Sequence, residues 1–152
     1  MRFLVCLALA TAGIALHPLC AAPAAPAASV NDSDTTELGG RMDEMRVSFR
    51  KLRRQVSVAS ANASSLELVA SLRLAAEQSA ALAPARAAAL PESTRAAFVA
   101  DFAEKMKAFI AEVDKLKAAL EAGKNDEAVA LVARLESLQK SGHREFRSAK
   151  RD

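Results

Sequence analysis

The chain has 152 residues, a formal net charge of +3, and neither Trp nor Tyr. A charge this small creates no field that would attract a polyanion, and without Trp or Tyr no surface for stacking bases is evident. The composition therefore argues against a nucleic-acid-binding protein. The length suffices for one modest hydrophobic core and leaves no room for a second domain.

The first 28 residues have the order of a secretory signal peptide. Arg2 provides a positive start, residues 3–16 are almost wholly apolar, and small residues follow, with candidate cleavage points between residues 21 and 28. The apolar run is too short to span a bilayer with ease. We therefore expect residues 29–152 to be exported to the periplasm as one domain without a membrane anchor.

Both cysteines, Cys6 and Cys20, lie in this leader. Lipidation at Cys20 is disfavoured, because His17, Pro18 and Leu19 are poor residues to precede a lipidated cysteine. The exported domain therefore has no thiol for a disulfide, an iron–sulfur cluster or a covalent haem linkage through sulfur. Packing alone must hold it together.

Hydrophobic residues at helical spacing predict a first helix. Asp34 and Glu37 form a candidate capping pair at its start. Gly39 and Gly40 follow, and because each costs about 1 kcal/mol against Ala inside a helix, we expect the first turn to fray. The apolar face comprises Leu38, Met42, Met45, Phe49, Leu52 and Val56.

A capping box, Ser64-x-x-Glu67, predicts that a second helix starts after a polar break. This helix is expected to run to about Leu82. Its small-residue face comprises Val69, Leu72, Ala76 and Ser79. An alanine-rich connector between Pro84 and Pro91 follows, and Pro91 suits the first position of a third helix.

The third helix has the strongest apolar stripe, which comprises Phe98, Phe102, Met106, Phe109, Val113, Leu116 and Leu120. Gly123 is expected to end it, and Asn125 or Asp126 to start a fourth helix. The face of the fourth helix comprises Ala128, Leu131, Leu135, Leu138, Gly142 and Phe146, with His143 at its edge. Short connections favour an all-α, antiparallel up-down-up-down four-helix bundle.

His143 is the only histidine outside the leader, so it limits the chemistry that the domain can support. One histidine without cysteine does not supply a structural zinc site, and no nucleophile motif accompanies it. A haem needs only two axial ligands, which one Met and one His can provide. In an up-down bundle Met42 and His143 fall near the same end. The alternative is that Met42 fills the core and His143 faces solvent near a helix terminus.

Two segments carry a resemblance to a known family. RMDEMRVSFRKL, around Met42, and AGKNDEAVALVARLESLQKSGHREFR, around His143, resemble the two ends of the cytochrome b562 family, and the similarity extends over roughly residues 35–148. The resemblance implies one non-covalent b-type haem with Met42 and His143 as axial ligands. It also places Arg147 where it can reach a haem propionate. The apolar pocket positions that it implies are Leu38, Met45, Phe49, Leu72, Phe102, Met106, Leu135, Leu138 and Phe146.

The chain departs from the family at Gln139 and Gly142, where members often have an arginine and an aromatic residue. In relatives with covalent haem those positions are the cysteines of CxxCH, so the sequence QKSGH excludes a c-type linkage. With both axial positions filled, the resemblance implies an electron carrier rather than an enzyme, working as a monomer with periplasmic redox proteins.

Two other functions stay open at this point. One is a haem-free periplasmic helical bundle that acts as a chaperone or adaptor. The other is a five-coordinate, gas-binding haem bundle in which Met42 does not ligate the iron. The cations between residues 50 and 54 are either the solvated side of the first helix or a docking surface for an acidic redox partner.

Overall fold

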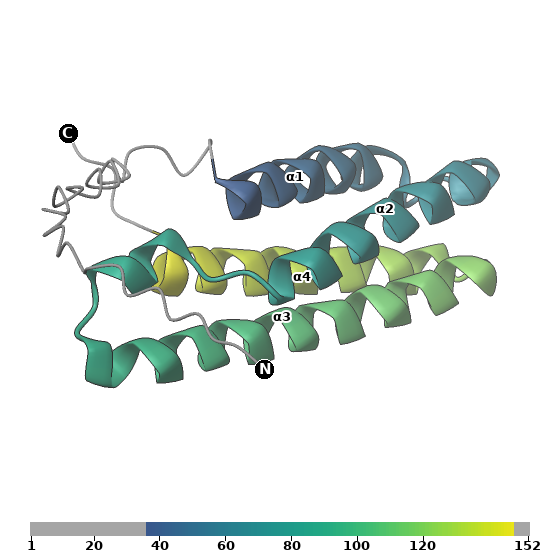
Figure 1. Cartoon of the computed structure of the whole chain (residues 1–152). Helices are drawn as coiled ribbons and strands as arrows, with labels where there is room; N and C mark the ends of the chain where they lie inside the picture. The colour runs from purple at the N-terminus through teal and green to yellow at the C-terminus, as the bar shows by residue number, and fades with distance from the viewer. Residues whose placement is uncertain (1–35, 148–152) are drawn as a thin grey trace, which may run out of the picture.

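The computed structural model describes residues 36–147, so the expected signal peptide at residues 1–28 lies outside the described residues. It confirms the all-α four-helix bundle (Figure 1). The helices are α1 (Glu37–Gln55), α2 (Asn62–Ala80), α3 (Glu92–Glu121) and α4 (Asn125–Phe146). Two short 3₁₀ helices, η1 (Ala59–Ala61) and η2 (Ala85–Ala89), lie in the connectors.

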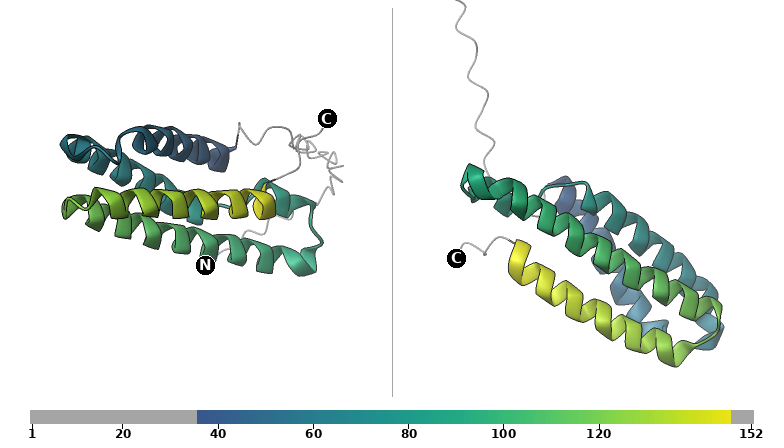
Figure 2. Two further views of the ribbon diagram at one scale, coloured as in Figure 1. Left: turned by 180° about the vertical axis from the view of Figure 1, so that it is seen from behind. Right: turned by 90° about the horizontal axis from the view of Figure 1, so that it is seen from below.

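The two ends of the bundle differ. The closed end contains the α1–α2 turn, residues 56–61, and the α3–α4 turn, residues 122–124. At the open end lie the start of α1, the end of α4 and the η2 connector (Figures 1 and 2). The sequential pairs α1–α2, α2–α3 and α3–α4 pack closely, whereas the backbones of α1 and α4 approach each other much less. The α1–α4 side is therefore the loosest seam of the bundle.

The core consists of the predicted apolar stripes. Its fully buried larger hydrophobic side chains are Leu52, Leu72, Leu116, Leu120, Leu135, Val69 and Val113. Each comes from a position that the helical spacing assigns to an inward face, which confirms the periodicity in all four helices. Burying each such side chain stabilises the fold by about 1.5–3 kcal/mol.

An amide pair ties the closed end together. Asn125 Nδ2 donates to Asn62 Oδ1 at 2.8 Å, and Asn62 Nδ2 donates back to Asn125 Oδ1 at 3.2 Å. Asn125 Nδ2 also donates to the Val56 carbonyl at 2.7 Å, and Asn62 Nδ2 to the Leu120 carbonyl at 3.4 Å. Two asparagines thus join the end of α1, the start of α2, the end of α3 and the start of α4.

The predicted start of α2 at a Ser64 capping box is wrong. The helix begins two residues earlier, at Asn62, and the Ser64 hydroxyl donates to the Ala61 carbonyl at 3.0 Å instead of capping a helix. Gln55 Nε2 in turn donates to Ser64 Oγ at 2.8 Å. Because Asn62 is held by the amide pair across the closed end, a tertiary contact sets this helix start and overrides the local capping signal.

The starts of α1 and α3 lie within a few residues of the expected positions, and α3 ends where expected. Thr36 caps α1, with its Oγ1 accepting from the Gly39 amide at 3.0 Å, whereas the expected Asp34 lies outside the described residues. Pro91 occupies the position before Glu92, the first residue of α3, instead of the first helical position. Gly123 ends α3 as expected, because its φ of 68° suits glycine. The Lys124 amide donates to the Ala119 carbonyl at 2.9 Å across this turn.

Two glycines are expected to respond in opposite directions to the same substitution. A Cβ at Gly40, inside α1, would meet nothing within 4 Å, so Gly40→Ala should stabilise the fold by about 0.5–1 kcal/mol. Gly123→Ala forces an L side chain into the left-handed region and should cost about 1–2 kcal/mol. Urea unfolding followed by circular dichroism measures both. A destabilised Gly40→Ala variant would mean that the first turn of α1 is not the helix described above.

Candidate functional site

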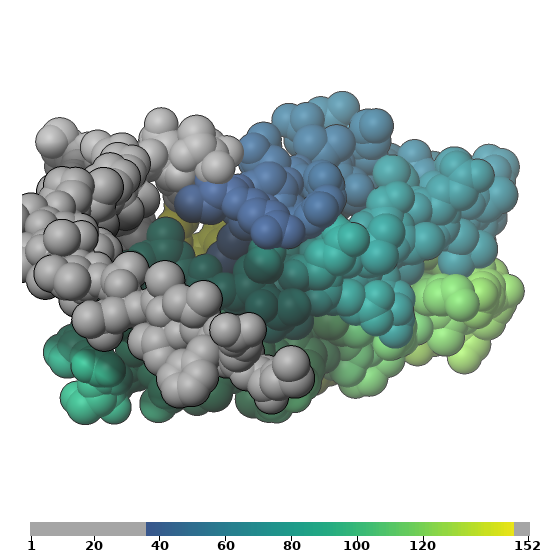
Figure 3. Space-filling model, viewed as in Figure 1, coloured from purple at the N-terminus to yellow at the C-terminus, as the bar shows by residue number. Residues whose placement is uncertain are grey.

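A cavity of about 280 Å³ lies at the open end. Residues of α1, α3 and α4 line most of it, and Leu72 of α2 and Pro84 of the connector complete the wall. Figure 3 shows a gap beside the first turns of α1 through which the end of α4 is visible. The cavity therefore coincides with the place where α1 and α4 separate.

Met42 and His143, the two candidate ligands, both line this cavity from opposite helices. Met42 is partly buried and packs against the hydrophobic core. His143 is exposed, at the mouth. The structure thus brings a thioether and an imidazole to one cavity, which is the donor set that a haem requires of its protein.

The two residues lie about one helical turn apart in height along the bundle. Measured from the Asn125–Val56 contact, Met42 lies about 21 Å and His143 about 27 Å toward the open end, at about 1.5 Å per residue. Helical side chains lean toward the N-terminus of their own helix. Met42 on α1 therefore leans toward the open end and His143 on α4 leans away from it, so the two side chains converge.

Most of the other predicted site residues gather around the same cavity. Those that line it are Leu38, Met45, Phe49, Leu72, Phe102, Met106, Leu138, Phe146 and Arg147. Leu135 is the exception, because it is fully buried in the core and does not line the cavity. The spacing put Leu135 on the correct face of α4, but one turn too far from the open end for it to reach the cavity.

Several lining residues were missed by sequence reasoning. Lys105 and Phe109 come from α3, and Pro84 and Ala85 from the connector. Phe109 was on the predicted core stripe, so its helix position gave a usable signal. No local pattern marks Pro84 and Ala85, because they reach the cavity only through the path of the connector.

Arg86 joins this connector to the end of α4. Its guanidinium donates to the Glu145 carbonyl and lies over the Phe98 ring, 5.7 Å from the ring centroid. The Phe98 ring lies 5.1 Å from that of Phe146, a cavity residue, and the Phe102 ring 5.3 Å from it. One arginine therefore holds the last turn of α4, which carries His143, against the start of α3.

Arg95 fixes the other side of the connector. Its Nε donates to the Ala87 carbonyl at 3.1 Å, and its Nη2 donates to the Leu90 carbonyl at 3.1 Å. Ala87, in the middle of η2, is buried. We refer to residues 84–90 as the η2 strap, because hydrogen bonds from Arg86 and Arg95 bind it to α4 and α3.

The charges around the cavity favour a neutral imidazole. Partial burial and the nearby positive charge of Arg147 lower the pKa of His143 below its usual value of 6.5. Arg46 is paired with Asp43 at 3.0 Å, and Lys105 lies 3.9 Å from Glu145. A neutral imidazole has the free lone pair that iron coordination needs.

The two departures from the family lie at the cavity as well. Gln139 and Gly142 both line it, and a Cβ at Gly142 would meet nothing within 4 Å. The wall beside His143 therefore has open space at the position where the family that the chain resembles often carries an aromatic side chain.

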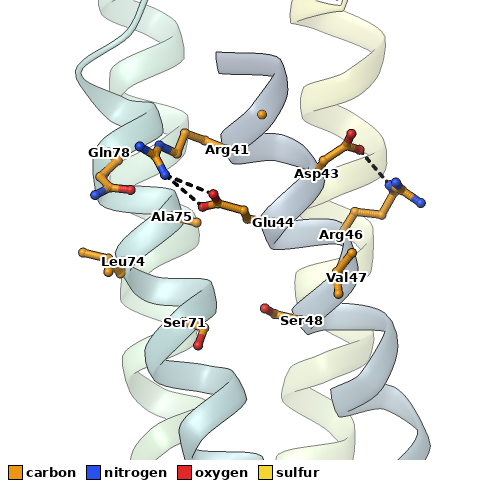
Figure 4. Close-up of a pocket in the computed structure, with 11 residues that line it drawn as sticks. Arg41, Asp43, Glu44, Arg46, Val47, Ser48, Ser71, Leu74, Ala75 and Gln78 are labelled. Atoms are coloured by element: carbon orange, nitrogen blue, oxygen red, sulfur yellow. Dashed lines mark hydrogen bonds and ion pairs between the residues drawn. The ribbon is translucent and has the colours of Figure 1, made fainter. Parts of the chain in front are cut away.

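A second hollow, on the outer face of α1 and α2, is a larger but shallow groove of about 680 Å³ (Figure 4). Its charged residues satisfy one another, since Arg41 pairs with Glu44 at 3.0 Å and Arg46 with Asp43 at 3.0 Å. None of the predicted ligand or pocket residues lines this groove. The cavity at the open end is therefore the candidate site.

Two further observations limit the chemistry of residues 36–147. This part of the chain contains no group of three or more His, Cys, Asp or Glu side chains that could hold a bare metal ion. None of its helices is long and apolar enough to cross a membrane. A porphyrin brings four nitrogen ligands of its own, so a two-residue donor set remains sufficient for haem iron.

Comparison with known proteins gives one result. The family model for cytochrome b562 matches residues 37–147, which is most of the chain and includes all four helices. Neither a curated protein nor a solved structure matches the chain significantly. A four-helix bundle with a thioether and an imidazole at one cavity, matched over its whole length by this model, belongs to the cytochrome b562 family.

Proposed function

We propose that the exported chain is a periplasmic electron carrier that holds one non-covalent b-type haem between Met42 and His143. The observation that carries the proposal is the position of these two side chains on different helices at one apolar cavity. Membership of the cytochrome b562 family supports it, since that family consists of haem-binding helical bundles that transfer electrons. The haem supplies one-electron redox chemistry.

The residues of the site fit a haem in three ways. Met42 and His143 offer the two donor atoms that a porphyrin leaves to the protein. The wall is largely aromatic and aliphatic, with Phe49, Phe102 and Phe146 among its members, which suits a flat apolar macrocycle and keeps water out. At the mouth, the guanidinium of Arg147 is available to a carboxylate such as a propionate.

Filling both axial positions from the protein determines the kind of function. No coordination position then remains for oxygen or for a substrate, so one-electron transfer is favoured over catalysis and over gas binding. A thioether ligand stabilises the reduced iron and raises the reduction potential relative to two histidines. The packed helices α2, α3 and α4 hold the pocket walls in place as the charge on the site changes.

Substitution of the two ligands tests the assignment. The parent holo-protein should give a six-coordinate low-spin spectrum. Met42→Ala should convert this to a high-spin form, and His143→Ala should largely abolish haem retention. Met106→Leu, which removes another cavity thioether, is the matched control and should keep the low-spin spectrum. Parent-like spectra from both ligand variants would refute the assignment, and failure of the apo-protein to bind haemin above the level of an unrelated protein would favour the haem-free adaptor.

The lowered pKa of His143 predicts how haem binding depends on pH. Protons compete with iron for the imidazole, so binding should weaken only as pH falls below the folded-state pKa, which lies under 6.5. Folding likewise favours the neutral form, so this contribution to stability is complete above about pH 6.5 and declines as pH falls through that value. Because His143 is the only histidine of residues 29–152, proton NMR of the exported apo-protein follows it directly. Arg147→Gln should raise its midpoint toward 6.5, and an unchanged or lower midpoint would contradict the proposed cause.

The η2 strap should affect the haem site through Arg86. Arg86→Ala removes the hydrogen bond to the Glu145 carbonyl and the contact with Phe98, so we expect haem affinity to fall about tenfold, or roughly 1.4 kcal/mol. Haemin titration of the apo-protein measures this. Arg86→Lys keeps the cation, so its haem affinity should lie between those of the parent and of Arg86→Ala. Arg73→Ala removes an exposed arginine that pairs with Asp114 and Glu77, away from the cavity, and should leave the affinity unchanged.

A further inference from the structure

Positive charge is concentrated along the side of the bundle where α1 and α4 face each other. We call this surface the α1–α4 seam, and define it by residues at helical spacing on the two facing edges. On α1 these residues are Arg46, Arg50 and Arg53, and on α4 they are Glu136, Lys140, His143 and Arg147. Spacings of three and four residues place each set on one edge of its helix.

Contacts fix the position of this surface in the fold. Arg53 Nε lies 2.5 Å from Glu136 Oε1, which joins the two edges directly. Arg46 and Arg147 line the cavity at the open end. The seam therefore runs from the middle of the bundle to the cavity mouth (Figure 2, left).

The charges of the seam are not balanced. Leaving His143 aside, the seam holds five cations and one carboxylate, Glu136, which pairs with Arg53, and Asp43 of α1 pairs with Arg46. Within residues 36–147, Arg50, Lys140 and Arg147 make no ion pair. The excess positive charge therefore lies beside the haem cavity.

Other faces of the same bundle show the opposite pattern. Arg73 contacts both Glu77 and Asp114 between α2 and α3. Between α3 and α4 the buried carboxylate of Glu112 forms ion pairs with Lys115 at 2.7 Å and with Arg134 at 3.4 Å. These faces use their charges within the fold. On the seam Arg50 and Lys140 are available to a partner, whereas Arg147 is the cation that the proposed function assigns to a propionate.

We infer that the α1–α4 seam is the docking surface for an acidic redox protein. The inference rests on the proposed function, because docking matters only if an electron leaves from the cavity mouth. Four of the five cations are arginines, whose planar guanidinium groups bind carboxylates through two hydrogen bonds. A positive seam next to the cofactor would steer an acidic partner and orient it with its redox centre close to the haem.

Electron-transfer kinetics test the field of the seam. The ferrous exported protein gives one electron to an oxidant, either ferricyanide, which is anionic, or tris(phenanthroline)cobalt(III), which is cationic. The second-order rate constant for ferricyanide should fall with added salt, and that for the cobalt complex should rise. At low salt the double variant Arg50→Glu/Lys140→Glu should react with ferricyanide at least about tenfold more slowly. Neither residue lines the cavity, so the haem spectrum should stay constant. The reduction potential of each variant is measured, so that the rate constants are compared at equal driving force.

The matched control makes the same change in net charge far from the cavity mouth. In Lys117→Glu/Lys124→Glu, Lys117 lies four residues before the end of α3 and Lys124 lies in the α3–α4 turn at the closed end. It should slow the ferricyanide reaction by less than about twofold, because the Coulomb attraction between a charge and the oxidant at the cavity mouth falls with their separation. An equal loss in both double variants would overturn the inference, since net charge alone would then explain the rates.

A binding experiment identifies the class of partner and separates this inference from the proposed function. A hexaglutamate peptide should shift the amide resonances of the seam in ¹⁵N-labelled protein, and the double variant Arg50→Glu/Lys140→Glu should abolish the shifts. Shifts spread evenly over all cations, or binding to phosphatidylglycerol vesicles without binding to the peptide, would overturn an acidic protein partner. If the peptide binds specifically to the seam but the protein does not bind haemin, the docking surface would be supported and the proposed electron-carrier function would be refuted.

Discussion

The reciprocal amide pair of Asn62 and Asn125 sets the register on which the rest of the site depends. It joins the ends of all four helices at the closed end, with the Val56 carbonyl of α1 held directly by Asn125. Because α1 and α4 approach each other little elsewhere, this contact fixes the position of α1 relative to α4 along the bundle axis. A slip of one turn that moved His143 further toward the open end would widen the offset between Met42 and His143 from about 6 Å to about 11 Å.

The open end shows how the fold accommodates a weakened pocket wall. Gly142 leaves space beside His143, and Gln139 replaces the arginine that many family members carry there. The η2 strap supplies an arginine from another direction, since Arg86 holds the last turn of α4 through the Glu145 carbonyl. The strap also contributes Pro84 and Ala85 to the wall. The connector between α2 and α3 thus supports the turn of α4 that carries His143.

The sequence predicted what depends on periodicity and missed what depends on distant contacts. The apolar stripes, the turn at Gly123 and the convergence of Met42 with His143 on one cavity follow from helical spacing and antiparallel connection. The start of α2 does not follow from spacing, because Asn62 is held by a hydrogen bond from Asn125, 63 residues further along the chain. The family resemblance assigned Leu135 to the pocket, whereas the structure buries it in the core without lining the cavity. Nothing local marks Arg86, whose partners lie on α3 and α4.

The two candidate ligands differ in how firmly the fold holds them. The turn of α4 that carries His143 is tied to the η2 strap by Arg86 and packed through Phe146 against two aromatic rings. The ion pairs near Met42 stay within α1, and glycines weaken the first turn of that helix. Under the proposed function, the thioether would therefore be the more easily released of the two candidate ligands. Its release would leave a haem held by histidine alone, so the stability of the first turn of α1 would decide between an electron carrier and a bundle with an open iron position.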